Sequence, residues 1–257
     1  LASATSQTYY VAFSYANTSV TSATSATNGN NCTISNNTMR TTASNSAGPY
    51  YGIVAMGNTS TYSSTGDNNN FTNNKIQNFY YYGIYNRYTN GEQFINNDIS
   101  RANATSSSST SSTMYGIYSY YVYSTNRSTA YNKNNFHDLP RAGVSLGSTP
   151  LNYFYGIYAY YNYGNTTYPF VVDKNIQKNI MVYYYAYNFY MNYNYVVDLT
   201  GNTVDNLKTY SSGYSTYPFY INYGSDYNIT GNTVKNCYMG ETGSSYAYTF
   251  YLYYIYN

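Results

Sequence analysis

The motif Tyr-Gly-Ile occurs four times, as Tyr51-Gly52-Ile53, Tyr82-Gly83-Ile84, Tyr115-Gly116-Ile117 and Tyr155-Gly156-Ile157. Three less regular copies follow, and we align them as Tyr184-Tyr185-Ala186, Phe219-Tyr220-Ile221 and Phe250-Tyr251-Leu252. A second motif, Asn followed by any residue and then an apolar residue, alternates strictly with the first. Tandem repetition at this spacing predicts a chain built from stacked repeats.

The second motif predicts a turn in each repeat. Lys174-Asn175-Ile176 is its one irregular copy, in which we assign Lys174 to the leading position. The other copies begin at Asn37, Asn74, Asn97, Asn134, Asn202 and Asn232. Because Asn tolerates a left-handed backbone and its amide can bond to the Asn of the next coil, we expect a ladder of stacked amides that is broken at Lys174.

The periodicity inside the first motif is two, which favours strands over helices. The residue before Gly is aromatic and the residue after it is nearly always aliphatic, so we expect both to face the core. This places Tyr82, Tyr115 and Tyr155 inside. The opposite face then carries an exposed series of tyrosines: Tyr85, Tyr118, Tyr158, Tyr187 and Tyr253.

Tyr, Asn, Thr, Ser and Gly dominate the chain, and the long amphipathic stretches of a helical repeat are missing, so an all-α fold is excluded. Propeller blades need four strands in each repeat, but only two or three strand-like runs fit here. The pattern predicts an all-β parallel β-helix of about seven to eight coils with a mean period near 32 residues. At roughly 4.8 Å a coil, the rod would be about 35 to 40 Å long.

We predict a single β-helix domain over residues 1–257, with a partial or irregular first coil at 1–30 and seven repeats at 31–257. We expect it to be a segment of a longer or assembling protein. Stacked coils lengthen a core rather than thicken it, so no second domain is required. The two cysteines, Cys32 and Cys237, would lie about 30 Å apart in the first and seventh coils, beyond the reach of a disulfide bond.

Composition excludes several classes of partner. Charged residues make up 8% of the 257 residues and the net charge is +2, so the clustered Lys and Arg of a nucleic-acid surface are missing. No apolar run approaches the length of a membrane span. No Cys/His metal spacing, phosphate loop or nucleophile elbow is present, and we expect no metal and no cofactor.

Leu199-Thr200-Gly201-Asn202-Thr203-Val204, Ile229-Thr230-Gly231-Asn232-Thr233-Val234 and Phe94-Ile95-Asn96-Asn97-Asp98-Ile99, together with the Tyr-Gly-Ile copies, carry a family resemblance. They resemble the right-handed parallel β-helix repeats of large secreted bacterial surface proteins over roughly residues 30–257. The resemblance implies an extracellular or cell-surface protein that forms an adhesive or scaffold structure. The same repeat type also occurs in polysaccharide lyases and hydrolases.

Both the lyases and the hydrolases of this resemblance need several carboxylates on one strand face. The nine carboxylates of this chain are scattered: Asp67, Glu92, Asp98, Asp138, Asp173, Asp198, Asp205, Asp226 and Glu241. The best coincidence between coils is a predicted ladder of Arg101, Asp138 and Lys178, which is typical of an ordinary solvated face. His137 is interpreted as a surface histidine in a turn. The sequence therefore argues against an enzyme.

Tyrosine accounts for 44 residues, and flat rings with phenol edges can stack on sugars, on one another or on a neighbouring chain. Our leading hypothesis is an extracellular structural protein, a subunit or segment of a fibre, sheath or adhesive stalk that assembles with copies of itself. A glycan-binding adhesin is the alternative, and a polysaccharide lyase or hydrolase the second one. The expected assembly or binding strip is Tyr85, Tyr118, Tyr120, Tyr158, Tyr160, Tyr187 and Tyr253.

Overall fold

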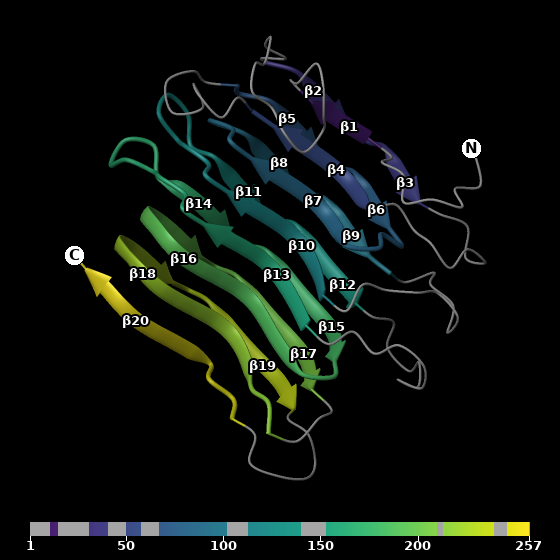
Figure 1. The fold of residues 1–257 in the computed structure, drawn as a ribbon, viewed down its shortest axis with the longest axis vertical. Coiled ribbons are helices and arrows are strands. Elements are labelled where there is room, and N and C mark those ends of the chain that lie inside the picture. Colours follow the sequence, from purple (N-terminus) through teal and green to yellow (C-terminus); the bar gives the residue numbers. More distant parts are fainter. Residues whose placement is uncertain are drawn as a thin grey trace.

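The computed structural model describes residues 11–14, 31–40, 50–57, 67–101, 113–139, 153–209, 213–238 and 246–256. Among these residues every regular element is a β-strand and every strand pairing is parallel. Successive strands stack along one axis from β1 to β20 (Figure 1). The prediction of an all-β parallel β-helix is confirmed.

Each coil contributes strands to three faces. The tyrosine sheet contains β1 (Val11–Ser14), β4 (Tyr51–Met56), β7 (Tyr82–Arg87), β10 (Thr113–Tyr120), β13 (Tyr153–Tyr160), the first parts of β16 (Tyr185–Thr200) and β18 (Thr216–Thr230), and β20 (Phe250–Tyr256). The second sheet contains β2 (Thr33–Ser35), β5 (Asn70–Thr72), β8 (Gln93–Ile95), β11 (Ala130–Asn132), β14 (Phe170–Asp173) and the later parts of β16 and β18. The third sheet contains β3 (Thr38–Arg40), β6 (Lys75–Gln77), β9 (Asp98–Ser100), β12 (Asn135–Leu139), β15 (Ile176–Val182), β17 (Thr203–Thr209) and β19 (Thr233–Tyr238).

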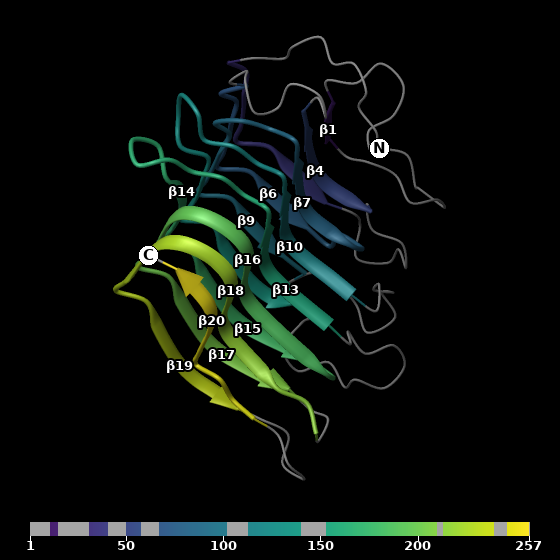
Figure 2. The same ribbon diagram turned by 60° about the vertical axis from the view of Figure 1, so that its left-hand side comes forward.

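Two strands join the first two sheets. β16 pairs with β13 through its first half and with β14 through its last four residues, and β18 follows β16 over the same course. Figure 2 shows both strands bending continuously around the coil. The tyrosine sheet and the second sheet thereby form one 13-stranded sheet, while the third sheet has seven strands.

The core consists of side chains stacked in columns along the axis. The tyrosine sheet supplies one fully buried column: Ile53, Ile84, Ile117, Ile157, Phe189 and Phe219. The second sheet supplies Phe71 and Phe94, whose ring centroids are 4.7 Å apart, followed by Tyr131. Each buried side chain of this size contributes about 1.5 to 3 kcal/mol to folding. The core therefore grows by one layer with each coil.

The glycine of the first motif breaks the alternation of the strand. In β10, Gly116 and Ile117 both face the interior, whereas Tyr115 and Tyr118 both lie on the outside. A Cβ atom on Gly116 would lie 2.6 Å from the Phe136 ring and 2.5 Å from the carbonyl oxygen of Gly156. Two successive inward residues form a bulge. The residues before Gly116 therefore lie on the face opposite to the one that strict alternation predicts. The predicted inward position of Tyr82, Tyr115 and Tyr155 is therefore wrong.

The three degenerate copies of the motif were aligned in the wrong frame. Tyr155 pairs with Tyr187 and Ile157 with Phe189, so Asn188 occupies the glycine position of that coil. The true copies are Tyr187-Asn188-Phe189, Tyr217-Pro218-Phe219 and Tyr248-Thr249-Phe250. They replace Tyr184-Tyr185-Ala186, Phe219-Tyr220-Ile221 and Phe250-Tyr251-Leu252. Without the glycine, a run of consecutive aromatics matches the pattern in more than one frame.

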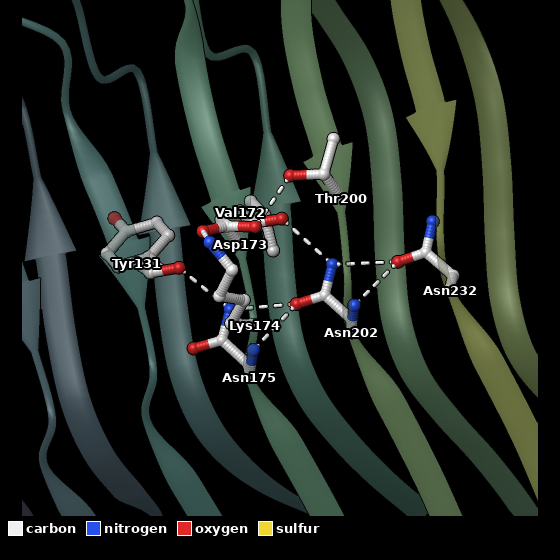
Figure 3. Close-up of polar contacts among 8 residues, drawn as sticks. All are labelled: Tyr131, Val172, Asp173, Lys174, Asn175, Thr200, Asn202 and Asn232. Carbon is white, nitrogen blue, oxygen red and sulfur yellow. Dashed lines mark hydrogen bonds and ion pairs between the residues drawn. The ribbon is translucent and has the colours of Figure 1, made fainter.

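A continuous amide ladder joins the second sheet to the third. In each step, both the backbone N–H and the Nδ2 of one Asn donate to the Oδ1 of the Asn one coil further on, over 2.9 to 3.1 Å. Nδ2 also donates to a carbonyl of the second sheet, as Asn175 does to Tyr131 at 2.7 Å and Asn202 to Val172 at 2.8 Å (Figure 3). The ladder contains Asn37, Asn74, Asn97, Asn134, Asn175, Asn202 and Asn232.

The ladder is not broken in the coil of Lys174. Asn175 takes the ladder position, between Asn134 and Asn202, and Lys174 precedes it. The left-handed residue of this turn is the one before each ladder Asn, with φ between 53° and 65° at Asn36, Asn73, Asn96, Lys133, Lys174, Gly201 and Gly231. The predicted break was therefore wrong by one residue, because the turn needs its unusual backbone at one position and its amide at the next.

Two buried polar groups interrupt the apolar core. Gln177 lies where other coils have an apolar residue, opposite Asn188. Its Nε2 donates to the Asn188 carbonyl at 2.8 Å, and the Asn188 Nδ2 donates to its Oε1 at 2.9 Å. The buried Tyr131 hydroxyl accepts from Asn86 and donates to Ser119, both at 2.7 Å. These hydrogen bonds replace the bonds to water that each polar group loses on burial.

Replacing Asn134 by Ala removes an acceptor for two donors of Asn97 and leaves these buried groups unsatisfied. Since each such group costs about 1 to 3 kcal/mol, we expect the free energy of unfolding to fall by about 3 kcal/mol or more. Chemical denaturation monitored by circular dichroism measures it. Asn228→Ala, which removes an exposed bond to Asp198 of 3.0 Å, is the control and should change it by about 0.5 kcal/mol or less. Equal effects of the two would contradict the ladder's role.

Lys133→Gly should stabilise the chain. Lys133 is exposed and has φ 57°, a conformation that costs an L-residue about 1 to 2 kcal/mol, partly offset by the greater chain entropy of Gly. We expect a net gain of about 0.5 to 1 kcal/mol, seen as a higher midpoint of thermal unfolding. Gly201→Ala, the reverse change in another coil at φ 63°, should lower that midpoint. A lower midpoint for Lys133→Gly would refute this account of the turn.

Candidate functional site: the tyrosine columns

Two columns of tyrosine rings cover the outside of the tyrosine sheet. In the first column, consecutive ring centroids lie 4.8 to 5.1 Å apart with the rings within 17° of parallel: Tyr51, Tyr82, Tyr115, Tyr155, Tyr187, Tyr217 and Tyr248. In the second column, the spacing is 4.9 to 5.2 Å and the rings lie within 4° of parallel: Tyr85, Tyr118, Tyr158, Tyr190, Tyr220 and Tyr251. In-register parallel strands place equivalent residues one strand spacing apart, which is also a stacking distance for rings.

The two columns pack edge to face. Tyr115 and Tyr118 have ring centroids 5.4 Å apart and planes at 89°, and the other coils repeat this arrangement, as Tyr187 and Tyr190 do at 5.5 Å and 90°. Rings thus lie parallel along a column and perpendicular between columns. Because the negative face of one ring meets the positive edge of another, both contacts are favourable.

A third column follows the corner where the tyrosine sheet ends. Its rings are spaced by 4.8 to 5.9 Å, and every member has a left-handed backbone with φ between 48° and 56°. This conformation costs about 1 kcal/mol or more for each tyrosine, so stacking has to compensate for it. The members are Tyr88, Tyr121, Tyr161, Tyr193, Tyr223 and Tyr254.

Six coils therefore carry one tyrosine in each of the three columns. Within a coil, these three tyrosines are spaced three residues apart in the sequence. Tyr115, Tyr118 and Tyr121 are one such set. This Tyr-x-x-Tyr-x-x-Tyr pattern was the signal in the sequence that would have found the columns. Sequence reasoning followed the glycine instead and so missed the third column, together with Tyr190, Tyr220 and Tyr251.

The residues of the predicted strip lie in three different rows. Tyr85, Tyr118 and Tyr158 belong to the second column, and Tyr187 to the first. Tyr85 is only 6% exposed, so its predicted exposure is wrong. Tyr120, Tyr160 and Tyr253 share a further row, in which Tyr120 stacks on Tyr160 at 5.7 Å but Asn192 and Asn222 separate Tyr160 from Tyr253.

The columns are neutral. Burial, and after it the neighbouring phenols, raises the pKa of Tyr155 and of Tyr220 to about 12 and also raises the pKa of Tyr115 and Tyr158. These hydroxyls remain protonated near neutral pH, so each can donate and accept a hydrogen bond. The ring faces are occupied by the stacking, which leaves edges and hydroxyls for contacts with other molecules.

One cation sits among the rings. Arg87 occupies the row of Tyr120 and Tyr160, and its guanidinium carbon lies 4.5 Å from the ring centroid of Tyr88 and 4.9 Å from that of Tyr120. Its Nη2 donates to the Tyr88 hydroxyl at 2.7 Å. The weakly hydrated guanidinium is suited to such a site, where it contacts ring faces and phenol oxygens together.

His137 lies between two carboxylates on the third sheet. Its Nε2 is 2.6 Å from Asp98 Oδ1 and its Nδ1 is 2.9 Å from Asp138 Oδ2, and its side chain is 17% exposed. The bond to Asp98 is the main cause that raises the pKa of His137. Burial opposes ionisation of Asp138, but hydrogen bonds from His137 and Asn179 outweigh it and lower the pKa of Asp138. The prediction of a surface histidine in a turn is wrong, because His137 lies within β12 and Asp98 reaches it from the preceding coil.

The predicted ladder of Arg101, Asp138 and Lys178 does not form. Asn179 is the residue that donates to Asp138, at 2.9 Å, and Lys178 pairs in register with His137 and Asp205. Arg101 is buried, and burial lowers its pKa to about 10. The error has the same origin as the misplaced break in the amide ladder, since numbering from Asn175 rather than Lys174 puts Asn179 opposite Asp138.

A further polar cluster lies at the entrance to the second sheet. Asn69 donates from Nδ2 to Glu92 Oε1 at 2.9 Å, and Arg127 donates to the carbonyls of Gly91 and Asn69 at 2.7 and 2.9 Å. Burial raises the pKa of Asp67 to about 7, although the Asn90 N–H donates to it. Within the described ranges, no group of three or more His, Cys, Asp or Glu is arranged to hold a metal ion.

Cys32 and Cys237 are both free thiols. Cys237 is half-buried and packs against the core from β19, where burial raises its pKa. In the parts of the chain that the structure describes, no helix is long and apolar enough to cross a membrane.

His137→Gln should destabilise the chain more at about pH 5.5 than at about pH 8.5. The raised pKa of His137 means that its ion pairs contribute fully below the unfolded value of 6.5 and are lost as the pH rises through the folded pKa. Thermal midpoints of the wild type and the variant at the two pH values measure this. Comparing the two chains at each pH cancels the separate titration of Asp67. A difference that is constant or grows with pH would rule out the charged histidine.

No protein-family model, no curated protein and no solved structure matches this chain. The resemblance to the β-helix repeats of secreted bacterial surface proteins therefore stays a prediction, as do the location and the role that it implies.

Proposed function

We propose that this chain is a structural protein, a subunit or segment of an extracellular fibre, sheath or adhesive stalk, that assembles with copies of itself. The observation that carries the proposal is the set of three tyrosine columns, which repeat in register through six coils. The columns present a regular wall of uncharged ring edges and hydroxyls, with the Arg87 guanidinium beside them in one coil. Such a wall suits lateral association with a surface of the same period.

The end of the rod supports stacking of further coils. Phe250 and Leu252 continue two interior columns, since Phe250 stacks on Phe219 at 4.6 Å and Leu252 pairs with Ile221. They are nevertheless 41% and 55% exposed, whereas Phe219 and Ile221 are fully buried. Eight of the nine exposed large hydrophobic side chains in the described residues lie between Tyr238 and Tyr256. Apolar side chains in interior positions are normally covered, and a further coil of the same kind, from the same chain or from another copy, would cover these.

The stacking also bears on the alternative of a glycan-binding adhesin. Aromatic side chains bind sugars through their ring faces, but within the columns each face already lies against the next tyrosine. At the C-terminal end of the columns, Tyr251 and Tyr254 each have one stacked tyrosine among the described residues, so their second faces are not covered by a ring of the same column. This distribution favours the structural role, in which ring edges make the contacts, over sugar binding along the whole face.

The proposed role needs no catalysis. In the cluster of Asp98, His137 and Asp138, the two carboxylates engage both nitrogens of the imidazole. We propose that this cluster stabilises neighbouring coils rather than acting on a substrate.

Assembly is tested by sedimentation velocity of the chain at low micromolar concentration together with negative-stain electron microscopy. We expect filaments with a repeat of about 35 to 40 Å or a multiple of it. Leu252→Lys places a charge on the exposed end of the rod and should return the chain to monomers, because a buried unpaired charge is costly. Ile176→Lys is the matched control, since Ile176 is 44% exposed in the middle of the third sheet, and filaments should persist.

A wild-type chain that stays monomeric at all concentrations would overturn the proposal. Filaments that form equally well with Leu252→Lys would show that the end of the rod is not the contact. Binding of polysaccharide by monomers would instead support the adhesin.

A further inference from the structure

The loop between β10 and β11 lies across the coils that precede it. Arg127 in this loop donates from Nε to the carbonyl of Gly91 at 2.7 Å and from Nη2 to a carbonyl one coil earlier at 2.9 Å. Thr125 and Asn90 exchange two further hydrogen bonds, of 2.7 and 3.0 Å. Residues 124–129, which we call the strap, therefore join the coil of β11 to the two coils before it.

Asn90, which the strap contacts, is held in place by Asp67. The Asn90 N–H donates to Asp67 Oδ2 at 3.1 Å, and the backbone N–H groups of Asp67 and Asn68 donate to the Asn90 carbonyl at 2.8 and 3.2 Å. From the preceding coil, the N–H of Asn31, next to Cys32, donates to the Asp67 carbonyl at 2.8 Å. Hydrogen bonds thus run from the side chain of Asp67 through Asn90 to the strap.

The Asp67 carboxyl is buried without a cation. Asp67 is 7% exposed, and among the described residues its carboxyl forms no ion pair and accepts a single hydrogen bond, from Asn90. The other charged groups of this corner have different partners, since Arg127 donates to carbonyl and amide oxygens and Glu92 accepts from Asn69. An ionised carboxylate in such a place is costly. Burial accordingly raises the pKa of Asp67 to about 7.

We propose that the strap is a pH-sensitive latch, which is closed while Asp67 is protonated and opens when Asp67 ionises. The protonated carboxyl still accepts from the Asn90 N–H and buries no charge. The carboxylate gains contact with water when the strap lifts, so ionisation favours the open form.

The direction of the pH dependence follows from the two forms. An aspartate in water ionises near pH 4, whereas burial moves the pKa of Asp67 to about 7 in the closed form. Between these values the closed form holds a proton that the open form has released, so the open fraction rises with pH and levels off above about 7. The latch is therefore tight in weak acid and loose at neutral pH and above.

The latch is confined to one part of the rod. In the coils of β16 and β18 the chain passes the same corner as a continuous strand, so neither strand is interrupted by such a loop. Opening would free the corner between β5 and β11 and leave the C-terminal coils intact. It is a property of a single chain, and it does not depend on the proposed assembly.

Hydrogen exchange of the full chain, followed by mass spectrometry, tests the latch through the amides of Gly91 and Thr125. In the closed form these amides donate to the Tyr123 carbonyl and to Asn90 Oδ1, both at 3.0 Å. After correction for the intrinsic effect of pH on exchange, we expect the open fraction at these amides to rise at least about tenfold from about pH 5 to about pH 7.

Matched variants separate the carboxyl from the strap. Asp67→Asn keeps the size and the acceptor of the protonated carboxyl but cannot ionise, so exchange should stay slow at both pH values. Asp226→Asn, which changes an exposed carboxylate bonded to Ser225 at 2.8 Å, is the control and should keep the wild-type rise. Arg127→Gln removes bonds of the strap and should exchange fast at both pH values. Circular dichroism checks that each variant folds.

An open fraction that is constant with pH in the wild type, or that rises equally in Asp67→Asn, would overturn the proposal. An equal rise at the amides of β18 would do the same, because it would report loosening of the whole rod. If Asp67→Asn does not fold, the comparison of the wild type with Arg127→Gln gives the decision. Because the latch lies within one chain, none of these outcomes decides whether the chain forms filaments.

Discussion

In-register parallel pairing is the constraint on which this structure depends. It fixes neighbouring coils one strand spacing apart, at about 4.8 Å, and places equivalent side chains directly above one another. That distance suits two kinds of contact. Amides can hydrogen-bond along the axis, as the ladder from Asn37 to Asn232 does, and aromatic rings can stack face to face, as in the tyrosine columns. The seven asparagines of the ladder and the nineteen tyrosines of the three columns make these contacts in coil after coil.

The sequence predicted the fold well and the surface less well. Repeats with an internal period of two were enough for a parallel β-helix, because few other architectures accept them. The side of the tyrosines was not predictable from alternation, since Gly116 adds one inward residue and reverses the face of Tyr115. The position of Asn175 was missed because the left-handed residue and the ladder residue are adjacent, and Lys174 is an unusual occupant of the left-handed position.

Contacts between coils were the hardest to foresee. His137 and Asp98 are 39 residues apart, and their approach depends on which residues of β9 and β12 pair, which a frame error of one residue would change. The same holds for Gln177 and Asn188, which are unremarkable polar residues in the sequence and partners in the interior. Loops of differing length between the motifs conceal such relations, because sequence distance no longer reports the coil.

Uniform columns do not by themselves determine which coil stacks on which. A tyrosine of one column stacks equally well on any other member, so the columns and the amide ladder do not distinguish one coil from another. The buried contacts of Gln177 with Asn188, and of Tyr131 with Asn86 and Ser119, do distinguish them. If a coil paired with the wrong neighbour, these polar groups would lie against apolar side chains, at the cost of a buried unsatisfied group. The few irregular polar residues of the interior therefore specify the order in which the coils that carry them stack, in an otherwise repetitive structure.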